Sequence, residues 1–186
     1  GNSRAVEKLL NKKYPYPVRG IFHTAAVLAD APADEQDKDH FNMAYNAKAM
    51  GAYNLHITSK DFELDYFVLF SSISATMGNH SQINYAGANC YLDALADYRR
   101  QQGLPGISIA WGAIGDVGMV ARNEGVERVL TARGILPIPI NEALSQMRDA
   151  LDHKGENVGI FNIDWKKWGS IGILSKDEPA HMIVTQ

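Results

Sequence analysis

The sequence predicts an α/β fold built on a parallel sheet with helices on its faces. Short apolar runs bounded by polar residues or glycine recur along the chain, and such runs are typical of strands that are buried on both faces. Long segments with apolar residues at helical spacing separate these runs. A helical crossover of this length requires parallel neighbouring strands and a right-handed connection.

Four strands are expected from the apolar runs. The clearest run is Phe67-Val68-Leu69-Phe70, and it breaks into a cluster of serines after Phe70. The expected strands cover residues 18–26, 65–72, 107–111 and 158–163. Residues 112–119 contain three glycines, a composition that suits a mobile lid over a site.

The helices are expected between these strands. Ser3 is expected to cap the first, in which Val6, Leu9 and Leu10 form one apolar stripe. Asn141 is expected to cap the last. The expected helices begin near residues 3, 41, 84, 124 and 141, with loops or connectors at 28–39, 73–83, 135–139 and 164–168.

Composition limits the classes of function. The 186 residues are 46% hydrophobic and 21% charged, which is typical of a globular domain. A net charge of −3 gives no electrostatic reason to expect a nucleic acid or an anionic membrane as partner. No apolar run approaches the ~20 residues of a membrane span, and no metal-ligand spacing is present. The single cysteine, Cys90, is interpreted as a core residue of a protein in a reducing compartment, the cytoplasm.

Polar side chains are expected where the second strand ends. Ligands of parallel α/β proteins bind outside the carboxyl ends of the strands, and Ser72 and Tyr85 are both expected there. Lys48 lies among small residues on one helical strip, so it either reaches solvent or has a partner in a cleft. His23 is interpreted as a buried histidine with its hydrogen bonds satisfied.

Residues 20–168 resemble the carboxyl-terminal two-thirds of a ketoreductase (KR) domain. Such domains belong to type I polyketide synthases and animal-type fatty acid synthases, within the short-chain dehydrogenase superfamily. The resemblance implies a Rossmann-like three-layer parallel sheet whose amino-terminal nucleotide-binding strands are missing. It also implies a partial domain over residues 1–168, with 169–186 as a tail or the start of a linker. The matching segments are 20–26, 65–72, 84–89, 103–106, 110–118 and 164–165.

The resemblance implies four catalytic residues: Lys48, Ser72, Tyr85 and Asn89. Ser72 lies thirteen positions before Tyr85, Lys48 twenty-four before Ser72, and Asn89 four after Tyr85. Most short-chain dehydrogenases have Tyr-x-x-x-Lys, whereas these ketoreductases exchange the lysine and asparagine positions. Tyr85 would be the general acid, with its pKa lowered by Lys48. Ser72 would polarise the ketone, and Asn89 would hold a water or the lysine in a proton relay.

The resemblance also implies a cofactor, NADPH, and a stereochemical outcome. Asp30 matches the second acid of the family's Leu-Asp-Asp motif, which marks formation of the (R)-3-hydroxyl. Met77 occupies the position where the opposite class has tryptophan. The residues expected to contact NADPH are Thr24, Ala25, Ala26, Lys48, Tyr85, Trp111 and Gly112.

The implied function is NADPH-dependent reduction of a β-ketoacyl thioester to the (R)-3-hydroxyacyl thioester. The partners would be an acyl carrier protein with its phosphopantetheine arm, the missing amino-terminal half of the domain and other synthase domains. The chain lacks the family's glycine-rich NADPH turn, so we expect it to be inactive alone, with an apolar parallel edge at strand 21–25. A non-catalytic interaction fragment and a stand-alone dehydrogenase for a small alcohol or ketone are the alternatives.

Overall fold

The computed structural model describes residues 2–117, 124–152 and 156–170. These residues form two compact units. The first contains Gly1–Trp111 and Leu144–Ile160, and the second contains Gly112–Ala143 and Phe161–Gln186. The expected tail lies outside the described residues from 171 onward, as do residues 118 and 119 of the expected lid.

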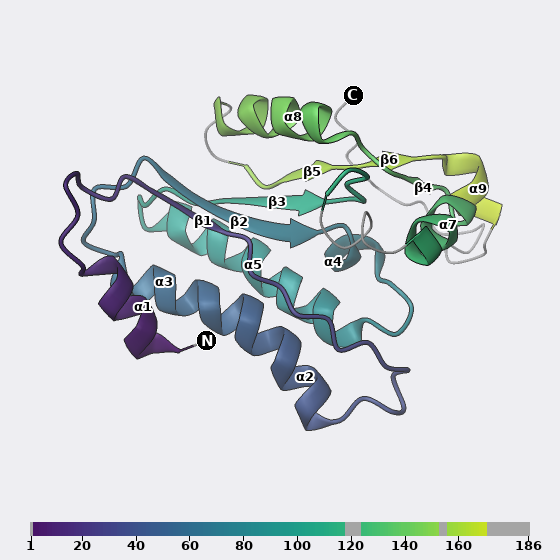
Figure 1. Ribbon diagram of the computed structural model, residues 1–186, viewed down its shortest axis with the longest axis horizontal. Coiled ribbons are helices and arrows are strands. Elements are labelled where there is room, and N and C mark those ends of the chain that lie inside the picture. The colour runs from purple at the N-terminus through teal and green to yellow at the C-terminus, as the bar shows by residue number, and fades with distance from the viewer. Residues whose placement is uncertain (1, 118–123, 153–155, 171–186) are drawn as a thin grey trace. The chain divides into compact units, whose positions relative to one another are not determined.

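A four-stranded parallel sheet forms the centre of the first unit (Figure 1). Its spatial order is β1-β2-β3-β5, which confirms the parallel α/β prediction. The strands are β1 (Gly20–His23), β2 (Tyr66–Ser72), β3 (Ile107–Trp111) and β5 (Val158–Ile160). β2 is the apolar run singled out above, and three of its residues, Phe67, Val68 and Leu69, have no exposed surface.

Helices cover both faces of this sheet (Figure 1). Residues 144–152 of α8 (Ile140–Asp152) lie on one face. A core cluster that includes Leu10, Ile21, Phe67, Leu69 and Leu92 joins the opposite face to its helices. The elements on that face are α1 (Ser3–Leu10), α2 (Lys38–Tyr45), the π-helical η1 (Asn46–Met50), α3 (Gly51–Thr58) and α5 (Ile83–Gln101).

Side-chain oxygens cap two of these helices, α1 and α2. Asn2, not Ser3, caps α1 by accepting a hydrogen bond from the Ala5 amide at 3.1 Å. Asp37 caps α2 through the amides of residues 39 and 40. A carboxylate or amide oxygen in this position satisfies amides that have no partner within the helix. An unexpected short helix, α4 (Ser74–Met77), also follows β2, where a loop was predicted.

The second unit differs from the sequence prediction in its strands. The expected strand 158–163 is split, because only β5 joins the parallel sheet and β6 (Asn162–Ile163) pairs antiparallel with β4 (Ile135–Leu136). The segment that forms β4 was predicted to be a connector. The strand ends before Pro137, since proline cannot donate a hydrogen bond to a neighbouring strand. The remaining elements are α7 (Glu124–Ala132), α9 (Trp165–Ser170), where a turn was expected, and the first residues of α8. Asp116, rather than Asn141, accepts the amide of Ile140 at the start of α8, at 2.8 Å.

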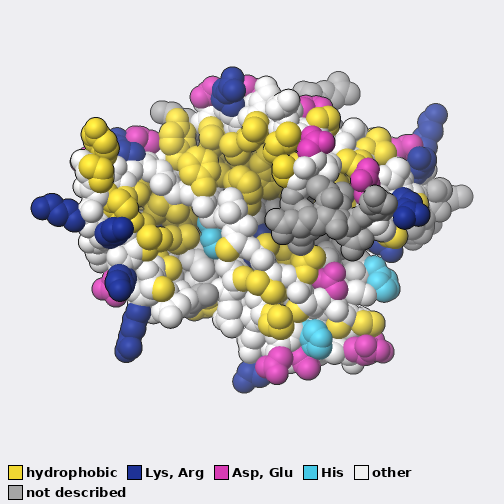
Figure 2. Space-filling model, viewed as in Figure 1, with side chains coloured by type: hydrophobic (Ala, Val, Ile, Leu, Met, Phe, Trp, Pro, Cys, Tyr) yellow, Lys and Arg dark blue, Asp and Glu magenta, His cyan; other side chains and the backbone are white. Residues whose placement is uncertain are grey.

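Strand β1 lies at an edge of the sheet in the described part of the chain, as predicted. Its Phe22 is 48% exposed and Tyr66 on the neighbouring strand is 39% exposed. Figure 2 shows hydrophobic side chains gathered on the viewed face over these strands. An open apolar edge of this kind is a surface that proteins normally pair or cover.

Cys90 is exposed, so its interpretation as a core residue was wrong. Helical spacing places Ala88, Asn89 and Leu92 on the buried face of α5. Cys90 falls on another face, where its thiol lies 3.4 Å from the Ala75 carbonyl oxygen. An apolar neighbourhood in sequence therefore did not identify the buried face of the helix.

Arg99 is a fully buried arginine of α5. Its guanidinium carbon lies 3.7 Å from the centre of the Phe67 ring. Its Nε donates to the Pro105 carbonyl at 2.7 Å, and Nη1 lies 3.0 Å from His56 Nδ1. Because arginine only donates, Nδ1 must be the unprotonated nitrogen of His56. Burial, together with the Arg99 charge, lowers the pKa of His56 from 6.5 to about 4.

We expect acid to destabilise the chain through His56. The unfolded state takes up a proton near pH 6.5 and the folded state only near 4, so the free energy of unfolding falls as pH drops through this window. The loss is on the order of 2–3 kcal/mol. Urea denaturation from pH 7 to 4 measures it. The variant His56→Gln keeps an acceptor for Arg99 without titrating, and its curve should lack this component; parallel curves for both proteins would contradict the assignment.

The π-helical segment packs against His23. The His23 Nε2 atom lies 2.9 Å from the carbonyl oxygen of Lys48, so His23 donates to this carbonyl. Gly51, the next residue after η1, has no side chain, and a Cβ atom there would lie 2.9 Å from His23 Cε1. π-Helical turns are rare and occur frequently at functional sites.

The substitution Gly51→Ala should therefore destabilise the chain by about 1–3 kcal/mol, because the added methyl overpacks the His23 ring. Chemical denaturation measures the effect. Gly87→Ala is the matched control, since nothing lies within 4 Å of its added Cβ. That control should gain about 0.5–1 kcal/mol from helix propensity. Equal stabilisation by both substitutions would show that His23 does not press on this position.

Candidate active site

The structure brings the four predicted catalytic side chains together in the first unit. Lys48 comes from η1, Ser72 from the end of β2, and Tyr85 and Asn89 from successive turns of α5. The Lys48 ammonium nitrogen lies 5.1 Å from the centre of the Tyr85 ring. The Ser72 and Asn89 side chains lie close enough to the Tyr85 phenol to affect its pKa.

Lys48 is held by two neighbouring strands. Its Nζ donates a hydrogen bond to the Phe70 carbonyl of β2 at 2.7 Å, while His23 of β1 binds its backbone carbonyl. Its side chain is buried, with the residue only 2% exposed. Burial lowers the pKa of Lys48 to about 8, and the charge of Asp93 opposes this shift. Lys48 therefore does not reach solvent, which excludes that alternative. It is a buried lysine that titrates close to neutral pH.

Tyr85 is 8% exposed, and its pKa is raised rather than lowered. Burial is the largest cause and the charge of Asp30 adds to it, whereas hydrogen bonding by Asn89 and Ser72 opposes both. The expectation that this pKa is lowered overall was wrong. The ammonium lies over the face of the ring, and desolvation of the phenolate dominates. Tyr85 therefore keeps its proton at neutral pH.

Asn89 is fully buried one turn after Tyr85. Its amide nitrogen donates to the Tyr85 backbone carbonyl at 2.8 Å. Its Oδ1 is buried and has no hydrogen-bond partner among the described residues. An unsatisfied buried acceptor costs about 1–3 kcal/mol, and a bound water or an ammonium at this position would remove that cost.

The residues predicted to contact NADPH have different environments. Thr24, Ala25 and Ala26 are exposed directly after the carboxyl end of β1. Trp111 ends β3 and is buried, with its ring 5.4 Å from that of Phe70. Gly112 is the first residue of the second unit. The exposed small residues allow the close backbone approach that a nucleotide requires, and the cofactor assignments stay predictions.

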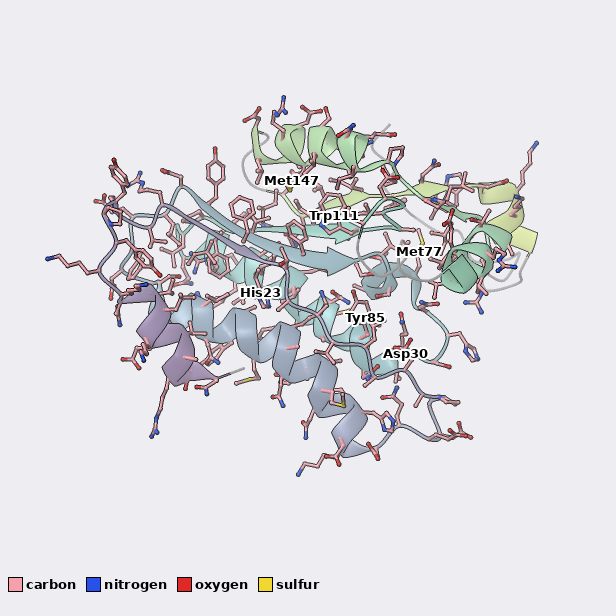
Figure 3. All side chains as sticks on the ribbon, in the orientation of Figure 1. His23, Asp30, Met77, Tyr85, Trp111 and Met147 are labelled. Atoms are coloured by element: carbon pink, nitrogen blue, oxygen red, sulfur yellow. The ribbon has the colours of Figure 1, made fainter. Side chains whose placement is uncertain are left out.

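Asp30 lies at the same end of the first unit as Tyr85 (Figure 3). It is exposed, and its Oδ2 accepts a hydrogen bond from Gln82 Nε2 at 2.8 Å. Its charge acts on the Tyr85 phenol. Met77, the last residue of α4, is partly buried. The structure thus places Asp30 near Tyr85, and its stereochemical role stays a prediction.

Several contacts of the site were not found from the sequence. His23 was interpreted as a satisfied buried histidine, which is confirmed, but its partner is the backbone carbonyl of Lys48, a predicted catalytic residue. Asn84 is fully buried beside Tyr85 and was given no role. In the sequence, only its position directly before Tyr85 pointed to a role for Asn84. Gln82 and Asp30 are far apart in the sequence, so no sequence pattern predicted their contact.

No group of three or more His, Cys, Asp or Glu side chains within the described ranges is arranged to hold a metal ion. None of the described helices combines the length and the hydropathy needed to cross a bilayer.

Comparison with known proteins agrees with the geometry. The model of the KR domain family matches residues 1–116. The hybrid PKS-NRPS synthetase pyvA of Aspergillus violaceofuscus (strain CBS 115571) is 44% identical over 132 residues, 71% of this chain and 4% of that protein. The squalestatin tetraketide synthase of Phoma sp. (strain C2932) is 40% identical over 140 residues, 75% of this chain and 5% of that protein. The chain therefore spans a small part of the curated relatives.

Solved structures give the same result. An A-type ketoreductase from a modular polyketide synthase has a TM-score of 0.90 at 34% identity, covering 96% of this chain and 38% of that one. The first ketoreductase of the tylosin PKS has a TM-score of 0.82 at 38% identity, covering 91% and 37%. A small-chain dehydrogenase in complex with NADPH shares the fold at 9% identity, with a TM-score of 0.72 over 86% of this chain and 78% of that one. The resemblance found in the sequence is thus confirmed, and the chain belongs to the KR domain family as part of a ketoreductase domain of a type I polyketide synthase.

Proposed function

We propose that this chain supplies the catalytic half of an NADPH-dependent ketoreductase within a multifunctional polyketide synthase. The substrate is a β-ketoacyl thioester on the phosphopantetheine arm of an acyl carrier protein, and the product is the (R)-3-hydroxyacyl thioester. The observation that carries the proposal is that Lys48, Ser72 and Asn89 gather around the Tyr85 side chain. Relatives that are synthases of polyketides favour that parent over a fatty acid synthase.

Each of these residues has a role in reducing a ketone. The Ser72 hydroxyl donates a hydrogen bond to the ketone oxygen and stabilises its developing negative charge. Tyr85, protonated because its pKa is raised, then gives its proton to that oxygen. Bound NADPH supplies the hydride. Lys48 offers a positive charge to the phenolate left behind, and Asn89 Oδ1, the unpaired buried acceptor, holds the water that returns a proton.

The exposed residues 24–26 and the ammonium of Lys48 are the groups of this chain that fit NADPH. Small side chains allow the backbone after β1 to approach the nucleotide, and Lys48 would hydrogen-bond the ribose. The sequence contains no G-x-G-x-x-G turn after a strand, which is the usual cradle for the pyrophosphate. We infer that the other half of the domain provides it and pairs with the open edge of β1.

Reconstitution tests this function. The chain is co-expressed with the amino-terminal half of the domain from its parent gene, and NADPH oxidation is followed with a β-ketoacyl thioester on the carrier protein. The complex should reduce the thioester and prefer it to free small ketones, while the chain alone should show no turnover. NADPH binding by the complex without reduction would support the interaction-fragment alternative. A preference for free ketones would support the stand-alone dehydrogenase.

In that complex, Tyr85→Phe should lower kcat by about 10²–10⁴-fold, since it removes a positioned general acid. Tyr98→Phe is the matched control, because Tyr98 lies on the same helix and is 48% exposed. The control should keep wild-type kcat, and circular dichroism should show that both variants are folded. A Tyr85→Phe enzyme with more than about a tenth of wild-type kcat would exclude Tyr85 as the acid.

The rate should also depend on the protonation of Lys48. Because the charged lysine is the active form and its pKa is about 8, kcat/KM should fall as pH rises through about 8. In Lys48→Arg the fall at this pH should disappear, since guanidinium keeps its charge, although the altered geometry lowers the rate. A fall at the same pH in both enzymes would assign it to another group.

A further inference from the structure

Hydrogen bonds join the segment just before Tyr85 to the segment that carries Asp30. Asn84 Nδ2 donates to the Ala29 carbonyl at 2.8 Å. Gln82 Nε2 donates to Asp30 Oδ2 at 2.8 Å. The Ala31 amide donates to the Ser81 carbonyl at 2.9 Å. Residues 29, 30 and 31 are thus bound by residues 84, 82 and 81, and we call these contacts the clamp.

Asn84 is the central residue of the clamp. It is fully buried, and its Nδ2 also donates to the carbonyl of His40 in α2 at 2.9 Å. Its Oδ1 accepts the backbone amide of Tyr85 at 2.8 Å. Both amide protons and the carbonyl oxygen are therefore in use. One side chain connects the Asp30 segment, the first turn of α5 and the helix that continues into η1 and Lys48.

The clamp includes a residue with a strained backbone conformation. Ser81 has a φ of 63°, and among the described residues it is the one non-glycine residue with a positive φ. This conformation is unfavourable for a residue with a Cβ atom, and such strain persists where the surroundings hold it. Gln36 Nε2 supports the same point, because it lies 3.1 Å from the Ala31 carbonyl oxygen and 3.5 Å from that of Ser81.

Resting on the proposed function, we propose that Asn84 and Gln82 are positioning residues that control stereochemistry. They hold the Asp30 segment at a fixed place beside Tyr85, and this segment limits how the ketone is presented to the phenol. Asp30 then acts as the anchor that Gln82 binds, and its negative charge is not itself the determinant. The proposal separates two roles for Asp30, a hydrogen-bond acceptor and a free charge.

The first experiment removes the clamp without changing Asp30. In the complete ketoreductase domain, Gln82→Ala and Asn84→Ser are assayed on the carrier-bound β-ketoacyl thioester, and the two 3-hydroxyl enantiomers are separated by chiral chromatography. Each variant should lower the enantiomer ratio at least about fivefold, the change that corresponds to roughly 1 kcal/mol between two transition states. His80→Ala is the control, since this exposed side chain contacts only the Ser81 hydroxyl in the clamp region, and it should leave the ratio unchanged.

The second experiment separates the two roles of Asp30. Asp30→Asn keeps an oxygen that accepts from Gln82 but removes the charge, and it should retain the wild-type ratio. Asp30→Ala removes both, and its ratio should fall as in Gln82→Ala. If Asp30→Asn lowers the enantiomer ratio while Gln82→Ala leaves it unchanged, the charge is the determinant and the proposal is overturned.

The outcomes distinguish this proposal from the proposed function. No reduction by the unsubstituted domain overturns the proposed function and this inference with it. Reduction with an unchanged ratio in Gln82→Ala and Asn84→Ser overturns the inference alone. If Asn84→Ser does not fold, Gln82→Ala decides, because Gln82 is only partly buried and leaves no large cavity.

Discussion

The buried ammonium of Lys48 is the constraint on which the site depends. A cation removed from water costs several kcal/mol unless polar groups replace its hydration. The Phe70 carbonyl and the face of the Tyr85 ring provide two such contacts, at 2.7 Å and 5.1 Å. These contacts come from β2 and α5, so strand and helix must keep their register for the charge to remain buried. A pKa of about 8 shows that the compensation is partial, which leaves the lysine able to exchange a proton near neutral pH.

The π-helical turn explains how one helix carries both the lysine and a packing face. A π turn holds one more residue than an α turn, so the residues after η1 are shifted around the helix axis. Lys48 and Ala49 are buried within η1, and Ala52, Asn54 and His56 are buried after it. Most of this set fits a 3.6-residue period, and Asn54 is the residue that falls on another face of the helix. The hydrogen bond from His23 to the Lys48 carbonyl supports the irregular turn, and Gly51 makes room for the imidazole.

The sequence predicted the elements whose signal is local. The apolar run of β2 gave the central strand, and the spacings among Lys48, Ser72 and Tyr85 gave the catalytic set through the family pattern. Properties that depend on three-dimensional surroundings were missed. The raised pKa of Tyr85 follows from burial, and the pairing of β4 with β6 follows from where the chain leaves the main sheet. The contact between Gln82 and Asp30 spans 52 positions and has no periodicity to reveal it.

The exchange of lysine and asparagine has a structural rationale in these contacts. Position 89 lies on α5 and is fully buried, where a neutral amide donates to the Tyr85 carbonyl one turn earlier. Position 48 lies beside the sheet, where the Phe70 carbonyl near the carboxyl end of β2 accepts the ammonium. A backbone carbonyl oxygen only accepts hydrogen bonds and an ammonium only donates them, so the two pair well. The Lys48 charge is therefore held against the sheet, and the Asn89 amide is held by its own helix.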